Sequence, residues 1–170
     1  DHQYGDALVC RDVMDVARDP SVDVLVELIG GTTVAYDLIK LAISQGKHVV
    51  TANKALIAEH GNELVKLAEA AGVQLRFEAS VAGGIPIIKV LRESMAANRV
   101  SEIAGIINGT GNFILTEMST KGRAFEDVLA EAQALGYAEA DPTFDVDGTD
   151  AAHKLVILSS LAFGIPLSID

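Results

Sequence analysis

The sequence contains one cysteine, no tryptophan and few aromatic residues, which together make up 5% of its 170 positions. A single cysteine cannot form an internal disulfide and fits a reducing compartment, so we expect a cytoplasmic protein in which Cys10 is a small buried apolar residue. With so few aromatic side chains, the core must be aliphatic, since 49% of the residues are hydrophobic.

Basic residues are also scarce: the chain has 13 lysines and arginines against 24 acidic residues, which gives a net charge of −11. An acidic protein is repelled by phosphate backbones and by anionic lipid headgroups, so we expect no nucleic acid and no membrane as partners. No stretch approaches the ~20 apolar residues that a membrane span needs. The first residues show no signal-peptide pattern.

Apolar runs alternate with amphipathic segments in the first half of the chain. The apolar runs predict strands at 22–29, 47–51 and 73–77, and the segments between them predict helices at 32–45 and 59–71. Repeated strand–helix units with this spacing are typical of a doubly wound fold. The sequence therefore predicts an α/β protein that begins with a partial Rossmann-type parallel sheet.

The pattern changes at the glycine-containing junction 78–86, and we place a domain boundary between residues 83 and 84. The part that follows is predicted to be α+β, with one strand at 101–108 and helices at 87–97, 109–119, 125–135 and 149–163.

Open α/β sheets bind ligands at the carboxyl ends of their strands. The turn at 30–33 presents backbone N–H groups to a phosphate or a ribose, or is only a tight turn with a threonine N-cap. Lys54 lies at the crevice after the second strand, or is an ordinary solvated lysine. The segment 109–114 begins like a dinucleotide-binding G-x-G-x-x-G loop but lacks the third glycine, so we do not assign it that role.

The stretch 136–154 holds five acidic residues and ends on a lysine. Like charges crowd together only where something cationic lies among them. Asp150 and Lys154 share one face of a predicted helix. They are either a surface ion pair worth about 0.3–0.5 kcal/mol, or an acid–amine pair that grips an amino acid and moves a proton. Asp147 either caps this helix or joins the site, and the pattern leaves Asp145 undecided.

Four segments carry a resemblance to a known family: VVTANKALIA (49–58), FEASVAGGIPIIK (77–89), GIINGTGNFIL (105–115) and GYAEADPTFDVDGTDAAHK (136–154). They occur in the order found in homoserine dehydrogenase, and the resemblance covers nearly the whole chain. It implies an NAD(P)-dependent oxidoreductase that interconverts L-homoserine and L-aspartate 4-semialdehyde in threonine, methionine and isoleucine biosynthesis.

The resemblance also implies a partial NAD(P)-binding Rossmann domain at 1–83 and an incomplete catalytic, substrate-binding domain at 84–170, which in the family also forms the dimer. The chain is then expected to act as a homodimer or homotetramer. By the same resemblance Lys154 is the proton donor, Lys54 lies at the nicotinamide and the substrate, and Glu139, Asp150 and Asp145 bind the substrate. The cofactor, NADP or NAD, contacts Thr32, Lys54 and Gly136, and a monovalent cation, usually sodium, is held by Glu78, Val81, Gly83 and Ile85.

The sequence departs from the family pattern in ways that leave other interpretations open. Gly111 stands where the family usually has threonine and gives the segment beside the substrate more freedom, and Thr149 replaces a usual aliphatic residue. The family's G-x-G-x-x-G loop is not in this sequence, which favours a non-catalytic dimerisation module of the same fold. A third interpretation is a Rossmann dehydrogenase that acts on another amino-acid aldehyde.

Overall fold

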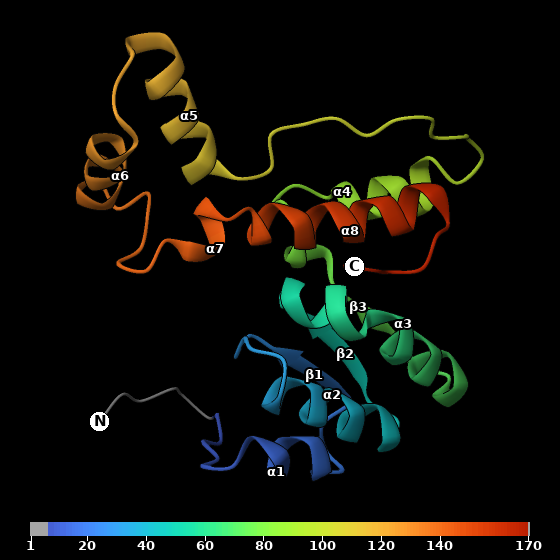
Figure 1. Cartoon of the computed structure of the whole chain (residues 1–170). Coiled ribbons are helices and arrows are strands. Elements are labelled where there is room, and N and C mark those ends of the chain that lie inside the picture. The colour runs from blue at the N-terminus through green and yellow to red at the C-terminus, as the bar shows by residue number, and fades with distance from the viewer. Residues whose placement is uncertain (1–6, 170) are drawn as a thin grey trace. The chain divides into compact units, whose positions relative to one another are not determined.

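The computed structural model describes residues 7–169, which form two compact units (Figure 1). The first unit ends at Gly84 and the second begins at Ile85, one residue from the expected boundary.

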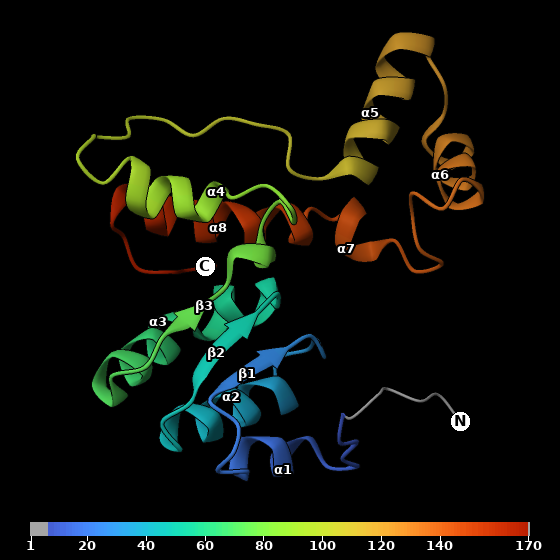
Figure 2. The same cartoon turned by 180° about the vertical axis from the view of Figure 1, so that it is seen from behind.

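The first unit is a parallel sheet with helices between its strands. In chain order it contains α1 (Val13–Arg18), β1 (Val24–Glu27), α2 (Val34–Ser44), β2 (His48–Thr51), α3 (Lys54–Ala71), β3 (Leu75–Arg76) and the 3₁₀ turn η1 (Glu78–Ser80). The strands pair in the order β1-β2-β3, and both pairings are parallel. Figure 2 shows the three arrows pointing toward the same edge of the sheet. The predicted α/β fold with a parallel sheet is confirmed.

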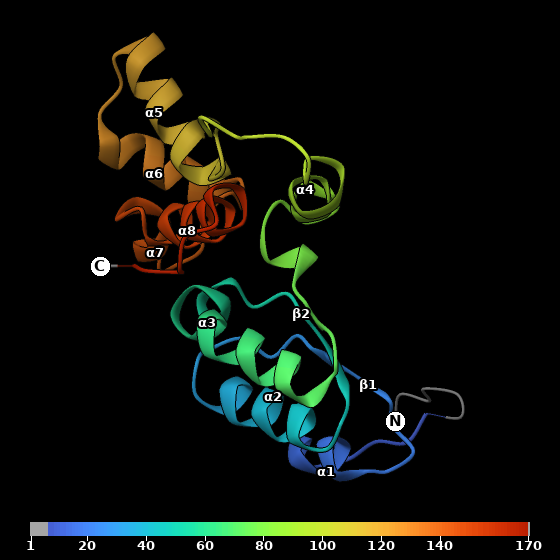
Figure 3. The same cartoon turned by 90° about the vertical axis from the view of Figure 1, so that its right-hand side faces the viewer.

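The core of the first unit lies between the sheet and the helices α2 and α3, which lie side by side (Figure 3). Alternate residues of β1 and β2 are buried, among them Leu25 and Val49. Ile39 of α2 and Leu64 of α3 are fully buried. They lie on the inward face of their helices, and the other face is exposed to solvent. The core is aliphatic, as the composition predicts, and only one face of the described sheet is covered.

Helix α3 begins earlier than predicted because Asn53 caps it. The Asn53 side chain accepts a hydrogen bond from the backbone N–H of Leu56, which satisfies a donor that the first helical turn leaves unpaired. The predicted start at residue 59 was therefore wrong, whereas the predicted end holds: Gly72 has a φ of 68° and closes the helix in the left-handed conformation.

The second unit consists of helices and irregular segments among its described residues. Its elements are α4 (Ile87–Lys89), which continues as the π-helical turn η2 (Val90–Ser94), then α5 (Gly109–Lys121), α6 (Phe125–Ala134), α7 (Thr143–Val146) and α8 (Thr149–Phe163). Helix α5 packs against α6 and α7, and α8 packs against α7 and η2. Helix α7 lies within the acidic stretch and was not predicted.

The strand predicted at 101–108 was wrong for the described residues, because this segment has no regular secondary structure. A strand forms only where a neighbouring strand supplies hydrogen bonds, and residues 85–169 contain no other strand. The predicted helix at 87–97 is also shorter, since it ends as a π-helical turn at Ser94.

The expected burial of Cys10 was wrong as well. Cys10 is exposed, as are its neighbours Leu8 and Val9, because no described helix or strand packs over this segment. None of the helices within residues 7–169 is both long and apolar enough to cross a membrane.

Candidate functional site

Asn108 joins three segments of the second unit that are distant in the sequence. Its side-chain amide donates to Asp145 Oδ1 at 2.8 Å and to Asp150 Oδ2 at 2.9 Å. Asp145 lies on α7 and Asp150 on the first turn of α8, 37 and 42 positions along the chain from Asn108. The residue before α5 therefore holds two carboxylates of the acidic stretch at one place.

Lys154 is held beside these carboxylates by two hydrogen bonds. Its amine donates to Asp150 Oδ2 at 2.6 Å and to the carbonyl oxygen of Ile107 at 2.8 Å. The side chains of Lys154 and Asp150 are only 19% and 11% exposed, so the pair is not on an open surface and water screens it less. An ammonium group has three N–H bonds, so one remains to donate to an oxygen of a bound molecule.

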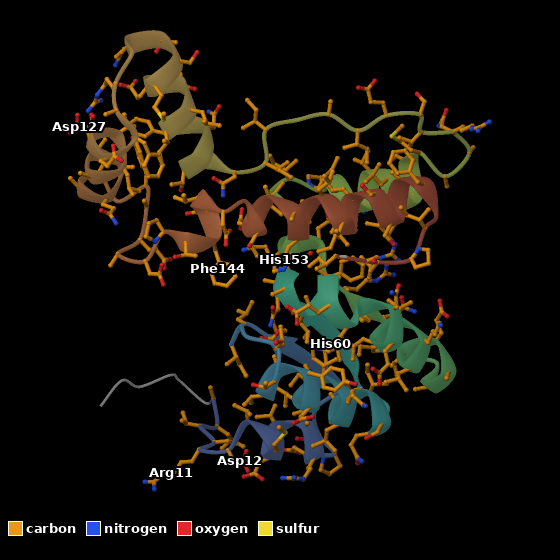
Figure 4. All side chains as sticks on the ribbon, in the orientation of Figure 1. Arg11, Asp12, His60, Asp127, Phe144 and His153 are labelled. Carbon is orange, nitrogen blue, oxygen red and sulfur yellow. The ribbon has the colours of Figure 1, made fainter. Side chains whose placement is uncertain are left out.

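Helix α8 presents the pair because of how it begins and packs. Gly148, with a φ of 85°, turns the chain into the helix in a conformation that disfavours other residues. Asp150, His153 and Ile157 are then buried along one stripe of the helix. His153 lies on α8, as Figure 4 shows. The hydrogen bonds from Asn108 and Lys154 hold the Asp150 carboxylate at the start of this stripe.

The pair lies at a pocket of about 450 Å³, a size that suits a small metabolite. Thr110 closes one side of it by donating to the carbonyl oxygen of Tyr137 at 2.6 Å, and the Phe113 and Tyr137 rings meet edge to face, with 5.2 Å between their centroids. The residues that line the pocket are Asn108, Gly109, Thr110, Phe113, Tyr137, Asp145, Asp150 and Lys154. The pocket has two carboxylates, of Asp145 and Asp150, and one ammonium group, of Lys154. Its net charge is therefore negative, which favours a ligand that carries a positive group.

Two other acids of the stretch stabilise its turns. Asp141 accepts hydrogen bonds from the hydroxyl and the backbone N–H of Thr143, which lower the pKa of its carboxyl below the ordinary value. Asp147 accepts from the backbone N–H of Thr149 at 2.8 Å, and the hydrogen bonds from Thr149 likewise lower the pKa of Asp147. Asp147 thus binds the first turn of α8, as the capping alternative predicts, although the residue directly before the helix is Gly148.

A second polar cluster lies in the first unit, at the carboxyl ends of β1 and β2. Glu27 is 1% exposed at the end of β1. One carboxylate oxygen accepts from the backbone N–H groups of Ile29 at 2.7 Å and Gly30 at 3.0 Å, and the other accepts from the Thr51 hydroxyl at 2.6 Å. These bonds satisfy the buried carboxylate and fix the chain after β1.

Asn53 extends this cluster to the loop after β2. Its side-chain amide donates to the carbonyl oxygen of Gly31 at 2.7 Å, and its backbone N–H donates to the Thr51 hydroxyl at 2.9 Å. The turn at 30–33 is therefore held from two strands. One alternative for this turn was a threonine N-cap. Thr33 does directly precede α2, but the predicted cap was wrong because the Thr33 side chain makes no capping hydrogen bond.

Comparison with known proteins gives the same two parts. Residues 86–170 match the homoserine dehydrogenase family, and residues 2–78 match the NAD binding domain of homoserine dehydrogenase. The chain belongs to the homoserine dehydrogenase family. The match to the NAD binding domain identifies the parallel sheet as part of a Rossmann-type fold.

Individual homoserine dehydrogenases are similar over most of the chain. The enzyme of Pseudomonas aeruginosa is 67% identical over 162 residues, which are 95% of this chain and 37% of that protein. The crystal structure of the enzyme from Thiobacillus denitrificans superposes with a TM-score of 0.90 at 63% identity, over 94% of this chain and 37% of that one. The structure of a hyperthermophilic archaeal homoserine dehydrogenase in complex with NADPH superposes with a TM-score of 0.85 at 34% identity. This match covers 94% of this chain and 50% of that one. The chain thus spans little more than a third of the Pseudomonas protein.

The homoserine dehydrogenase resemblance implies four residues of the second unit at the substrate, and the structure places three of them at one pocket. Asp145, Asp150 and Lys154 lie together in the pocket. Glu139 is exposed on the loop between α6 and α7, and it is not one of the described residues that line this pocket. Gly136, the implied cofactor residue of this unit, follows α6 with a φ of 74°, a conformation that glycine adopts at little cost.

The other implied cofactor residues lie in the first unit. Thr32 is half-buried in the turn that Asn53 holds, and Lys54 is the half-buried first residue of α3 rather than a loop residue. Neither placement tests a contact with the cofactor, so both roles stay predictions.

The implied cation residues follow β3. Glu78 opens η1, Val81 is buried, Gly83 is exposed, and Ile85 is the first residue of the second unit. Hard cations prefer oxygen ligands, so backbone carbonyls are a suitable donor set. The Ile85 carbonyl already accepts from the N–H of Ile87 at 2.8 Å and keeps a second lone pair. Residues 7–169 contain no cluster of three or more metal-ligating side chains, and the carbonyl site stays a prediction.

The sequence analysis missed two organising residues, Asn108 and Glu27. Asn108 directly precedes a predicted helix, which is a capping signal, and Glu27 is the one charged residue at the end of an apolar run. Gly111 was expected to loosen a loop, but it lies in the first turn of α5, where its N–H donates to Asn108 Oδ1 at 2.6 Å.

Proposed function

We propose that the protein containing this chain is a homoserine dehydrogenase, which interconverts L-homoserine and L-aspartate 4-semialdehyde with NAD(P). It would serve threonine, methionine and isoleucine biosynthesis. The observation that carries the proposal is the part-buried Asp150–Lys154 pair at a pocket, in a chain whose two halves match both parts of that family.

The second unit supplies the acid–base chemistry. Lys154 is directed into the pocket by Asp150 and by the Ile107 carbonyl, and its remaining N–H donates to the aldehyde oxygen of the substrate. As negative charge develops on that oxygen, the ammonium stabilises it and transfers a proton. In the reverse direction the amine of Lys154 removes the hydroxyl proton of homoserine.

The carboxylates orient the amino-acid end of the substrate. Asp145 and Asp150 both accept hydrogen bonds from the Asn108 amide, so the two carboxylates lie close together. Their combined negative charge would attract the ammonium group of the substrate. We assign Glu139, on the adjacent loop, the same task. Fixing this end holds the aldehyde at the reacting distance, which lowers the entropy lost on reaching the transition state.

We assign the first unit to NADP or NAD, whose reduced form would supply a hydride to the aldehyde and whose oxidised form would accept one from homoserine. Gly30 and Gly31 both have positive φ, and no atom lies within 4 Å of where a Cβ would stand on either, so a ligand can approach the backbone of this turn closely. Thr32, Lys54 and Gly136 would contact the cofactor. The related archaeal enzyme was solved in complex with NADPH.

We further propose that the carbonyls of Glu78, Val81, Gly83 and Ile85 hold a monovalent cation such as sodium. The protein would act in the cytoplasm as a homodimer or homotetramer, with a small-molecule substrate.

The test is oxidation of L-homoserine by the full-length protein, as wild type and as Lys154→Ala, with NAD and with NADP. We expect kcat to fall by about 10²- to 10⁴-fold, the contribution of a positioned general acid, while the circular dichroism spectrum stays unchanged. Lys66→Ala, at an exposed position of α3, is the matched control and keeps full activity. No homoserine turnover by the wild type would contradict the proposal and favour the non-catalytic module.

A further inference from the structure

All three hydrogen-bonding groups of the Asn108 side chain are used. Oδ1 accepts from the backbone N–H of Gly111 at 2.6 Å, and Nδ2 donates one N–H to Asp145 and one to Asp150. A flipped amide would set Oδ1 against two carboxylates and Nδ2 against an N–H donor, so only one orientation is compatible with the contacts. The amide is therefore fixed at both of its ends.

The two carboxylates need such a group between them. Asp145 and Asp150 repel one another at short range, and the amide N–H groups offset this repulsion without adding charge. Oδ2 of Asp150 accepts both from Asn108 and from Lys154, at 2.9 and 2.6 Å, so it is held from two sides. Loss of the Asn108 donor would weaken the hold on this carboxylate and, through it, on the Lys154 amine.

We propose that Asn108 is a positioning residue, whose amide holds the carboxylates of Asp145 and Asp150 in place and thereby keeps the Lys154 amine directed into the pocket. This inference rests on the proposed function, because the pocket is taken as the substrate site.

A purely structural role for Asn108 is the competing explanation, since it is also the N-cap of α5. The two roles use different atoms and can be separated. Aspartate and serine cap helices about as well as asparagine. Asn108→Asp and Asn108→Ser keep an acceptor for the Gly111 N–H, but both lose the amide donor, and the aspartate adds a third negative charge.

The experiment compares these variants with wild type in the full-length protein. We expect a thermal unfolding midpoint close to wild type for Asn108→Ser and a lower midpoint for Asn108→Asp, because its added carboxylate is repelled by Asp145 and Asp150. In both variants kcat should be lower by about 10- to 100-fold because the proton donor is misplaced. The change in KM should be smaller. The pH–rate profile of Asn108→Asp should move to higher pH, because an added carboxylate favours the protonated amine. Asn112→Asp, an exposed change of the same kind one turn along α5, is the control and keeps the wild-type profile.

Wild-type kcat, KM and pH profile in both variants, with the fold retained, would overturn the positioning role and leave Asn108 as a helix cap. If wild-type protein shows no homoserine turnover, the proposed function fails instead. The inference is then tested by crystal structures of wild type and Asn108→Ser: a turned Asp150 carboxylate with a displaced Lys154 amine supports it, and unchanged positions of both groups contradict it.

Discussion

The first unit buries many aliphatic side chains and one carboxylate, whereas the second buries few apolar side chains and holds its carboxylates at a pocket. In the first unit α2 and α3 place Ile39, Leu56 and Leu64 against a sheet, and Glu27 at the end of β1 is 1% exposed. In the second unit large apolar residues such as Ile106 and Phe144 are 76% and 64% exposed.

The difference shows two uses of a hydrogen-bonded carboxylate. Glu27 is saturated by Ile29, Gly30 and Thr51, so it stabilises loops and has little capacity left for a ligand. Asp150 is held by Asn108 and Lys154 at the wall of a pocket, where a ligand can reach it. Access to a pocket, rather than residue type, separates the carboxylate that holds a loop from the carboxylate that a ligand can reach.

The largest expected effect comes from shortening a buried side chain in each unit, which tests whether the first unit has the more densely packed core. Ile39→Ala in the first unit should lower the free energy of unfolding by about 2–5 kcal/mol, because its fully buried site cannot collapse around the cavity. Ile157→Ala in the second unit should lie near the lower end of that range, since its surroundings are less densely buried and can relax. Urea unfolding followed by circular dichroism measures both. Equal losses would contradict the difference between the units.

Replacing the buried carboxylate has the next largest effect. Glu27→Gln keeps an acceptor for Ile29 and Gly30, but its amide meets the Thr51 hydroxyl as a second donor and leaves the hydroxyl hydrogen without an acceptor. We expect a loss of about 1–3 kcal/mol, the cost of an unsatisfied buried group. Glu69→Gln, at an exposed position of α3, is the matched control and should leave the urea midpoint unchanged. A variant as stable as wild type would show that Glu27 is not needed to fix the loop.

The exposed acid at the start of α8 gives the smallest effect. Hydrogen bonds from Thr149 lower the pKa of Asp147 below its ordinary value of 3.8. The stabilisation is therefore present above that value and is lost as the pH falls through the depressed pKa of the folded state. Asp147→Asn should be less stable than wild type at pH 7, and the two should converge at a pH well below 3.8.

The readout for Asp147 is the urea midpoint at both pH values. Asp127→Asn on the exposed surface of α6 (Figure 4) makes the same change of charge and should show no such convergence. A constant difference between Asp147→Asn and wild type at all pH values would contradict the proposed linkage.

Much of the fold follows from local sequence signals. The apolar runs predict the three parallel strands, and Gly72 and Gly164 mark the ends of α3 and α8, since glycine adopts the left-handed conformation at little cost. The spacing of Asp150 and Lys154 predicts that they share a helix face, and the structure pairs them. These features depend on residues that are close in the sequence.

The sequence by itself determined the α/β class, the glycine-marked ends of α3 and α8, the acid–amine pair and the family. Only the tertiary structure decided that 101–108 forms no strand, that Glu27 is buried, and that Asn108 reaches Asp145 and Asp150. Each of these depends on what lies across the fold: a strand needs a partner to supply hydrogen bonds, and the Asn108 contacts join residues 37 and 42 positions apart. Local propensity and periodicity carry no information about such distant neighbours, because those are chosen by the packing of the whole unit.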